Sequence, residues 1–360
     1  MYRRRALAAA VVVLAGMVIP SAAATETHEP LVIGHRGASA YRPEHTLASY
    51  ELAARMGAGY VEPDLVSTKD GKLVARHENE IGGTTDVAAH PEFLGRKTTK
   101  TIDGAAVTGW FTEDFTLAEL KTLRAKERIP EIRPRNTLYD GRFEVPTFDE
   151  VIALTRRLSR ELHRDIGIYP ETKHPTYFKS IGLPLERRLV DTLNRNGLNR
   201  RNAKVFVQSF EVSNLKELNK SLRVPIVQLI NASGAPYDFI ASGDKRTYSD
   251  MITPAGLKEI ATYADGIGAT KDRIIPRNAA GFLQQPTTLV ADAHQAHLVV
   301  HAWTFRNENN FLPADFRSSA DPAAYGKAFA EYEVFLQQGI DGLFADNPDT
   351  AIEALKSPIV

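Results

Sequence analysis

Short runs of apolar and β-branched residues recur along the chain, and most are followed by a stretch in which apolar positions repeat with helical spacing. The short runs predict strands at Leu31–Gly34, Gly59–Ser67, Leu73–His77, Ile166–Thr172, Lys204–Ser209, Pro225–Ile230, Gly266–Ala269, Leu298–Phe305 and Gly342–Asp346. The helical stretches lie at Thr46–Met56, Thr147–Leu162, Pro184–Asn196, Val212–Lys220, Thr253–Ala264, Thr287–Ala296 and Tyr325–Gln338. Strands that alternate with helices are typical of parallel βα units. About eight such units favour an α/β fold of the (β/α)8 TIM-barrel class over an open sheet.

One long segment interrupts this alternation. From about Ile81 to Thr147 the chain has many turn residues, one short helical pattern at Leu117–Leu123 and no obvious βα repeat. We interpret residues 81–147 as an insertion after the second strand region that lies over one end of the barrel. It is not expected to be a separate domain, so a single barrel domain would span residues 25–360.

The first 24 residues have a pattern of their own. Three arginines near the start precede an apolar stretch from Ala6 to Ile19 and the small residues Ala22–Ala24. This order is typical of a cleavable secretory signal. A membrane anchor is the alternative, but the apolar stretch is shorter than the roughly 20 residues of a membrane span. We therefore expect a signal peptide at 1–24 and a soluble, secreted or periplasmic protein, exported by the general or the twin-arginine route.

Composition narrows the range of partners. The 360 residues are 43% hydrophobic and 24% charged, an ordinary globular balance. Residues 1–24 hold three of the 44 basic residues and none of the 44 acidic ones, which leaves the remainder with a formal charge of −3. The sequence has no basic run of the kind that binds nucleic acid or an anionic membrane. It also has no cysteine, so disulfides are excluded.

Titratable residues gather where the predicted strands end. His35 and Arg36 stand between two glycines, which permit close approach of a ligand to the backbone. Glu62 and Asp64 lie two apart in a strand and therefore point to the same face. Pro63 between them cannot donate to a sheet ladder, so this part of the strand is expected to lie where pairing ends. Active sites of parallel barrels form at the carboxyl ends of the strands. Two carboxylates there suit a hard divalent cation.

Two further stretches extend this group. In "GIYPETKHP" a proline precedes Glu171, which supplies a third carboxylate, and Lys173 shares its face. The strand "LVARH" returns after a turn at Asp70–Gly71 and brings His77 close to Glu62. Two histidines on opposite sides of a phosphorus centre allow one to accept a proton while the other donates one. With a metal and an arginine to offset the charge of the oxygens, the pattern predicts cleavage of a phosphodiester.

Several separated segments agree with this interpretation in type and order. They are "HRGASAYRPEHT", "GYVEPDLVSTKDGKLVARHE", "IYPETK", "EDFTLAELKTL", "PTFDEVI", "YADGIG", "LVVHAWTFR" and "GIDGLFADNPD". Together they resemble the glycerophosphodiester phosphodiesterase family, particularly its exported bacterial branch, over nearly all of the chain after residue 30. The resemblance implies a TIM barrel with an inserted segment and hydrolysis of glycerophosphodiesters to glycerol 3-phosphate and an alcohol. It also implies that a neighbouring glycerol hydroxyl attacks first and forms a cyclic phosphate, which water then opens.

The resemblance also implies roles for individual residues. It implies catalysis by His35 and His77, phosphate binding by Arg36, metal binding by Glu62, Asp64 and Glu171, and substrate contact by Lys173 and Trp303. Gln208 ends the strand "VFVQSF" and is suited to line the mouth of the pocket. For Glu44 two roles stay open, namely orienting Arg36 or ligating the metal. Many family members have aspartate where this chain has Glu78, so the geometry of any acid that orients His77 stays open as well.

Two other functions remain as alternatives. One is a barrel phospholipase that acts on lipid or phosphoinositide head groups, although the sequence has no convincing membrane loop and stable membrane insertion is not expected. The other is an exported protein that binds glycerophosphate without turnover, which would need no pair of histidines. We expect small glycerophosphodiesters as substrates, with teichoic-acid-type polymers also open. Ca²⁺ is the favoured metal and Mg²⁺ the alternative, because the ligands are hard oxygens and the setting is extracellular.

Overall fold

The computed structural model describes residues 29–356. The expected signal peptide at 1–24 lies outside these residues. Within the described part, no helix has the length and apolar character that crossing a bilayer requires.

The parallel strands form a closed ring. They are β1 (Leu31–His35), β2 (Tyr60–Glu62), β3 (Asp64–Ser67), β7 (Gly167–Ile168), β8 (Glu171–Thr172), β9 (Val207–Ser209), β10 (Ile226–Ile230), β11 (Gly266–Thr270), β12 (Val299–Phe305) and β13 (Gly342–Ala345). β2 and β3 are halves of one strand interrupted at Pro63, and β7 and β8 are halves of another interrupted at Pro170. The expectation that pairing ends at Pro63 is therefore wrong, because the strand resumes pairing at Asp64 once past the residue that lacks an N–H. Counting each pair once, the described strands occupy eight positions, and β13 pairs with β1 to complete the ring. The predicted TIM barrel is confirmed.

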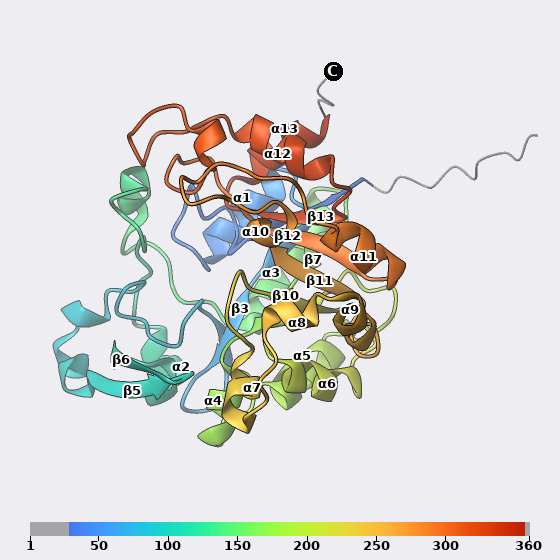
Figure 1. Ribbon diagram of the computed structural model, residues 1–360. Coiled ribbons are helices and arrows are strands. Elements are labelled where there is room, and N and C mark those ends of the chain that lie inside the picture. Colours follow the sequence, from blue (N-terminus) through green and yellow to red (C-terminus); the bar gives the residue numbers. More distant parts are fainter. Residues whose placement is uncertain (1–28, 357–360) are drawn as a thin grey trace, which may run out of the picture.

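Helices follow the strands and lie around the ring (Figure 1). The helices are α1 (Leu47–Arg55), α3 (Phe148–Glu161), α4 (Pro175–Ser180), α5 (Glu186–Arg195), α6 (Val212–Asn219), α7 (Tyr237–Ser242), α8 (Tyr248–Met251), α9 (Pro254–Ile260), α10 (Lys271–Ile274), α11 (Leu289–Gln295), α12 (Ala328–Leu336) and α13 (Pro348–Lys356). α3 illustrates why these segments are helical. Thr147 and Glu150 form a reciprocal capping box at its start, and its buried side chains, such as Val151 and Leu158, repeat with helical spacing.

The chain between the second strand region and α3 has a different structure. β4 (Leu73–Ala75) pairs antiparallel with β3. It is followed by short 3₁₀ turns, by a hairpin of β5 (Thr98–Ile102) and β6 (Ala105–Gly109), and by the one-turn helix α2 (Leu117–Leu120). In Figure 1 the hairpin stands to one side of the barrel, at the lower left. We refer to residues 81–147 below as the insertion.

The interior of the barrel contains a buried histidine. His301 is only 1% exposed, and its Nδ1 lies 2.8 Å from the hydroxyl of Tyr169. Burial lowers the pKa of His301 to about 4. The folded state therefore resists a proton that the unfolded chain, with an ordinary histidine pKa of about 6.5, accepts readily.

This burial predicts acid sensitivity. Between pH 6.5 and 4 the unfolded state binds the extra proton, so the free energy of unfolding should fall as the pH is lowered, with His301 contributing about 3 kcal/mol over the range. His301→Asn should flatten this part of the pH dependence, as measured by urea unfolding at a series of pH values. A variant whose slope equals that of the wild type would show that His301 is not the group responsible.

Candidate active site

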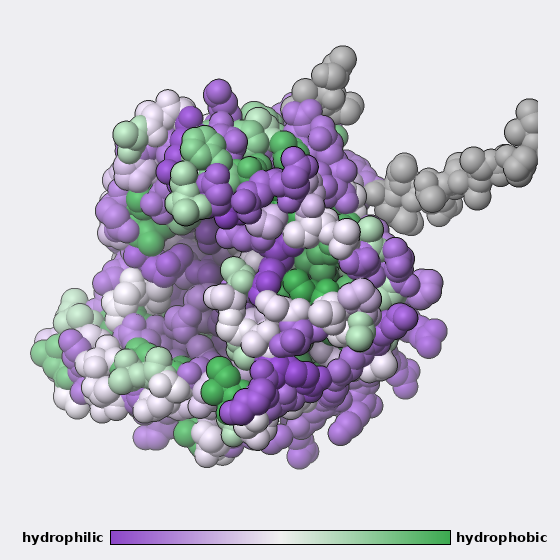
Figure 2. All heavy atoms as spheres, viewed as in Figure 1, coloured by the Kyte–Doolittle hydropathy of each residue, from purple (hydrophilic) through white to green (hydrophobic). Residues whose placement is uncertain are grey.

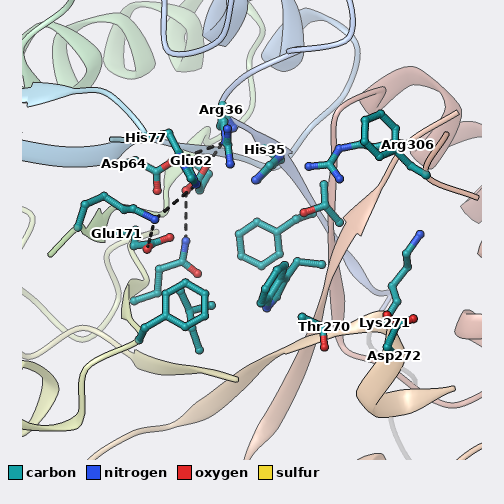
Figure 3. Close-up of a pocket in the computed structure, with 18 of the residues that line it drawn as sticks. His35, Arg36, Glu62, Asp64, His77, Glu171, Thr270, Lys271, Asp272 and Arg306 are labelled. Atoms are coloured by element: carbon teal, nitrogen blue, oxygen red, sulfur yellow. Dashed lines mark hydrogen bonds and ion pairs between the residues drawn. The ribbon is translucent and has the colours of Figure 1, made fainter. Parts of the chain in front are cut away.

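A pocket of about 250 Å³ opens at the carboxyl ends of the strands. The predicted residues that line it are His35, Arg36, Glu62, Asp64, His77, Glu171, Lys173, Gln208 and Trp303. Figure 3 shows Arg36, His35 and His77 on the same side of the pocket as the carboxylates of Glu62, Asp64 and Glu171. Thr270, Lys271 and Asp272 lie on the opposite side. In the space-filling view this face is hollowed, and hydrophilic residues predominate around the hollow (Figure 2). The structure thus brings nine of the ten predicted residues into one cavity.

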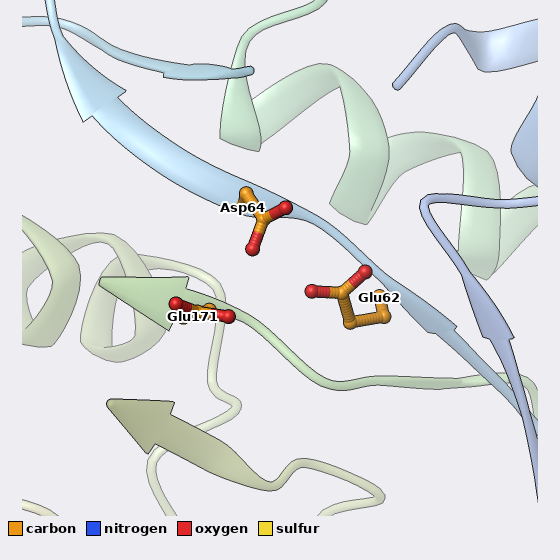
Figure 4. A group of neighbouring side chains, drawn as sticks. All are labelled: Glu62, Asp64 and Glu171. Atoms are coloured by element: carbon orange, nitrogen blue, oxygen red, sulfur yellow. The ribbon is translucent and has the colours of Figure 1, made fainter. Parts of the chain in front are cut away.

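The three predicted metal ligands converge. Oxygens of Glu62, Asp64 and Glu171 lie within 4.8 Å of one another, and all three residues are buried. The register explains this, because Asp64 pairs directly with Glu171 across β3 and β8, and the carboxylates face a common space (Figure 4). Asp64 Oδ1 has no hydrogen-bond partner within residues 29–356. A buried oxygen without a partner, next to two further hard oxygen donors, fits a divalent cation.

The like charges of Glu62, Asp64 and Glu171, called the acidic trio below, repel one another. Burial, together with the neighbouring Asp64 and Glu171, raises the pKa of Glu62 well above its usual value. Burial likewise raises the pKa of Glu171 to about 8, although Lys173 opposes the shift. Carboxylates that resist ionisation at close range gain stability from a bound cation, because its charge replaces their mutual repulsion with attraction.

His35 is oriented by an acid from the far end of the chain. Its Nδ1 lies 2.6 Å from Oδ1 of Asp346, which directly follows β13. Although burial favours the neutral acid, Arg306 and Arg133 hold the pKa of Asp346 well below its usual value. The ionised carboxylate can only accept a hydrogen bond, so His35 donates from Nδ1 and its Nε2 keeps a free lone pair. Burial and the adjacent Arg36 lower the pKa of His35 to about 4.

His77 has the same arrangement with a different acid. Its Nδ1 lies 2.7 Å from Oε1 of Glu78, so the longer side chain of glutamate does reach the imidazole. Burial, followed by the charges of Arg36 and Lys173, lowers the pKa of His77 to about 3. Lys173 Nζ stands 3.5 Å from His77 Nε2 and 3.0 Å from Glu171 Oε1, between the histidine and the trio.

Arg36 occupies a tight turn after β1. Its φ is +59°, and a Cβ on the following Gly37 would meet Ser49 atoms at 2.4–2.8 Å, so a side chain there is excluded. The backbone N–H of Arg36 donates to Glu62 Oε2 at 2.8 Å, and its Nη1 contacts Glu44 Oε2 at 3.0 Å. Its Nε forms no hydrogen bond within the described part of the chain, although Arg36 lines the pocket.

The other three predicted residues are Glu44, Gln208 and Trp303. Glu44 does not line the pocket but contacts Arg36. Gln208 Nε2 lies 3.3 Å from Glu62 Oε1 at the edge of the trio. The indole N–H of Trp303 donates to Gly268 O at 2.8 Å, and its ring lies edge-on to that of Phe210.

The sequence interpretation did not assign Asp346 or Arg306. Both follow the carboxyl ends of strands, β13 and β12 respectively, and both contact the site. The rule that identified Glu62 and Glu171, a polar residue at a strand end, applies to them equally. Arg133, which reaches Asp346 from the insertion, gives no such signal.

Comparison with known proteins identifies close relatives. Residues 35–350 match the model of the Glycerophosphoryl diester phosphodiesterase family. Glycerophosphodiester phosphodiesterase GDPD6 of Arabidopsis thaliana is 37% identical over 93% of this chain and 88% of that protein. Glycerophosphodiester phosphodiesterase of Haemophilus influenzae is 30% identical over 91% of this chain and 90% of its own length.

Solved structures share the fold. A putative glycerophosphoryl diester phosphodiesterase from Silicibacter pomeroyi superposes with a TM-score of 0.63 at 18% identity, covering 91% of this chain and 94% of that one. An Oleispira antarctica phosphodiesterase in complex with the product sn-glycerol-3-phosphate gives a TM-score of 0.58 at 21% identity, covering 91% and 97%. The sequence matches extend from the first strand to the last helix of the barrel, and the chain belongs to the glycerophosphodiester phosphodiesterase family.

Proposed function

We propose that this protein hydrolyses glycerophosphodiesters to sn-glycerol 3-phosphate and an alcohol. The observation that carries the proposal is one pocket lined by two imidazoles, each with its Nδ1 within 2.7 Å of a carboxylate oxygen. Arg36 and the acidic trio line the same pocket. The names of the curated relatives support this activity, as does the product bound to the Oleispira antarctica structure. A protein that only binds glycerophosphate would not need the oriented imidazoles, and nothing within the described residues favours a phospholipase.

Glu62, Asp64 and Glu171 would hold a divalent cation. Three carboxylates supplied by the protein favour Ca²⁺, which accepts many oxygen ligands, over Mg²⁺, which retains most of its water. Bound there, the ion would supply positive charge against the phosphate oxygens. Arg36, which lines the pocket, would bind another phosphate oxygen through its guanidinium.

The two histidines would exchange a proton across the phosphorus centre. One accepts the proton of the neighbouring glycerol hydroxyl as its oxygen bonds to phosphorus. The other, whose protonated form is favoured by the negative charge of the bound phosphate, donates to the alcohol oxygen as that P–O bond breaks. A cyclic phosphate results. Water then adds to phosphorus with the roles of the histidines reversed, and the ring oxygen takes up the returned proton. The attached hydroxyl acts at a high effective concentration, which favours it over water in the first step.

This mechanism predicts a substrate requirement. The wild-type protein with Ca²⁺ should release glycerol 3-phosphate from glycerophosphocholine, as followed by a coupled dehydrogenase assay. The 2-deoxy analogue, which lacks the neighbouring hydroxyl, should react at least about a hundredfold more slowly. Equal rates with both compounds would contradict attack by the hydroxyl, and no release from any glycerophosphodiester would contradict the function. Polymeric glycerophosphates of the teichoic-acid type belong in the same substrate series.

We also propose that the protein acts outside the cytoplasm, as a member of the exported branch. The proposal rests on the sequence of residues 1–24, with its arginines, apolar stretch and small residues. Mass spectrometry of the protein secreted by an expressing cell should find a first residue near Thr25. An intact Met1 on the exported protein would contradict cleavage.

A further inference from the structure

Three hydrogen bonds between charged side chains connect the insertion to residues that contact the pocket. They begin at Asp103, Arg128 and Arg133, which lie at separate places in the insertion. Each continues through one or two side chains and ends on His77, Arg36 or His35. We propose that the insertion is a positioning element of the active site, which holds the two histidines and the phosphate-binding arginine through these three chains of contacts. The proposal rests on the hydrolase function proposed above.

The chain to His77 contains two intermediate residues. Oε1 of Glu78 lies 2.7 Å from Nδ1 of His77, and its Oε2 lies 2.8 Å from Nε2 of His174. His174 Nδ1 in turn lies 2.6 Å from Oδ2 of Asp103. Asp103 occupies the turn of the β5–β6 hairpin, where its own φ is +47° and that of Gly104 is +81°. The tip of the hairpin therefore determines where Glu78, and with it His77, can lie.

His174 carries a charge in this chain. Burial opposes its protonation, but the hydrogen bonds to Asp103 and Glu78 raise its pKa to about 9. At neutral pH both ring nitrogens therefore donate, one to each carboxylate. Hydrogen bonds from His174 and His77 outweigh partial burial and lower the pKa of Glu78 below its usual value. Glu78 thus stays an acceptor, and His77 keeps its proton on Nδ1.

The chain to His35 is shorter and more deeply buried. Arg133 donates to Asp346 Oδ2 at 2.6 Å, and the other oxygen of Asp346 accepts from His35. Arg133 also donates to Glu308 at 2.7 Å and to the carbonyl oxygen of Ser39 at 3.0 Å. Its side chain is only 4% exposed, so these contacts fix it from several sides.

The third chain ends on Arg36. Arg128 Nε donates to Oε2 of Glu44 at 2.8 Å, and the same oxygen accepts from Arg36 Nη1 at 3.0 Å. Glu44 is buried, whereas Arg128 is about one-third exposed. The ion pair of Arg96 with Glu119 differs from these three, because within residues 29–356 neither residue forms a hydrogen bond or ion pair that leads on to a side chain lining the pocket. The three chains are therefore not a general property of the charges of the insertion.

Such contacts matter because small displacements of a reacting group reduce the rate strongly. A histidine that loses its orientation should lower kcat, since proton transfer belongs to the transition state. An arginine that loses its orientation should mainly raise KM, since it binds phosphate in the ground state and the transition state alike. Substitutions in the insertion are therefore expected to lower kcat where the contacts lead to a histidine and to raise KM where they lead to Arg36.

The test compares four variants. Asp103→Ala should lower kcat about tenfold with KM within about twofold of the wild type. Asp103→Asn should restore most of kcat, because its amide oxygen still accepts from His174. Arg128→Gln should raise KM about fivefold and change kcat little. Arg96→Gln is the matched control within the insertion and should change neither constant.

Two measurements report positioning without turnover. Arg128→Gln should weaken binding of glycerol 3-phosphate in calorimetry, and Asp103→Ala should shift the imidazole ¹⁵N resonances of His77 in the folded protein while those of His301 stay in place. If Asp103→Ala and Arg128→Gln leave kinetics, product binding and His77 resonances as they are in Arg96→Gln, the insertion has no positioning role. If the wild-type protein binds product but hydrolyses no diester, the proposed function is wrong. Product binding and the His77 resonances of the variants then still decide whether the insertion has a positioning role.

Discussion

Replacing His77 with alanine is expected to lower kcat for glycerophosphocholine by about a thousandfold, and replacing His35 should do the same. General acid–base groups contribute on this scale, and each imidazole lines the pocket with its Nδ1 already committed to a carboxylate. Neither histidine belongs to the acidic trio, so calcium affinity should stay within a few-fold of the wild type. Initial rates of glycerol 3-phosphate release and calcium titration by calorimetry measure both expectations.

Two further variants make this prediction specific. Because the histidines act in one proton exchange, the double variant His35→Ala/His77→Ala should be scarcely slower than either single variant. His294→Ala is the matched control, since His294 pairs with Asp341 away from the pocket. It should keep wild-type activity. If either single variant kept more than about a tenth of the wild-type kcat, the acid–base pair would be wrongly identified.

Removal of divalent cations is expected to abolish turnover and to lower the melting temperature. A calcium ion at a thousand times its Kd contributes about 4 kcal/mol to the stability of the folded state, which corresponds to several degrees in Tm. The effect depends on the acidic trio, whose members otherwise repel one another. Differential scanning calorimetry and rate measurements after exhaustive chelation, followed by addition of Ca²⁺ or Mg²⁺, test it and distinguish the two ions.

Glu171→Gln provides the control for the metal. The substitution keeps the shape of the side chain and removes one charged ligand from the trio. Calcium should then raise the Tm of the variant much less than that of the wild type. Turnover that survives full chelation would remove the role of the metal, and an equal calcium response in Glu171→Gln would place the ion elsewhere.

The barrel was predictable because it depends on local patterns. Short apolar strands followed by amphipathic helices specify βα units, and a parallel ring brings their carboxyl ends together. Glu62, Asp64 and Glu171 could therefore be grouped from the sequence alone, although they are 109 positions apart at most. The strands β5 and β6 were missed because their side chains are largely exposed and show no regular apolar alternation.

The connections of the insertion were not predictable for a different reason. Arg133 meets Asp346 across 213 positions and Arg128 meets Glu44 across 84. An arginine in a loop has no periodicity that indicates its partner. These contacts depend on the three-dimensional path of the insertion, which the pattern of apolar residues does not specify.

The pairing of the first strand with the last has a consequence for synthesis. β1 lies beside β13, and His35 is hydrogen-bonded to a residue 311 positions further on. While the ribosome is still translating, β1 has an open edge and His35 has no acid to orient it. The ring closes and the imidazole acquires its partner only when almost the whole polypeptide has emerged. A nascent or prematurely terminated chain therefore has an incomplete sheet and lacks the acid that orients His35.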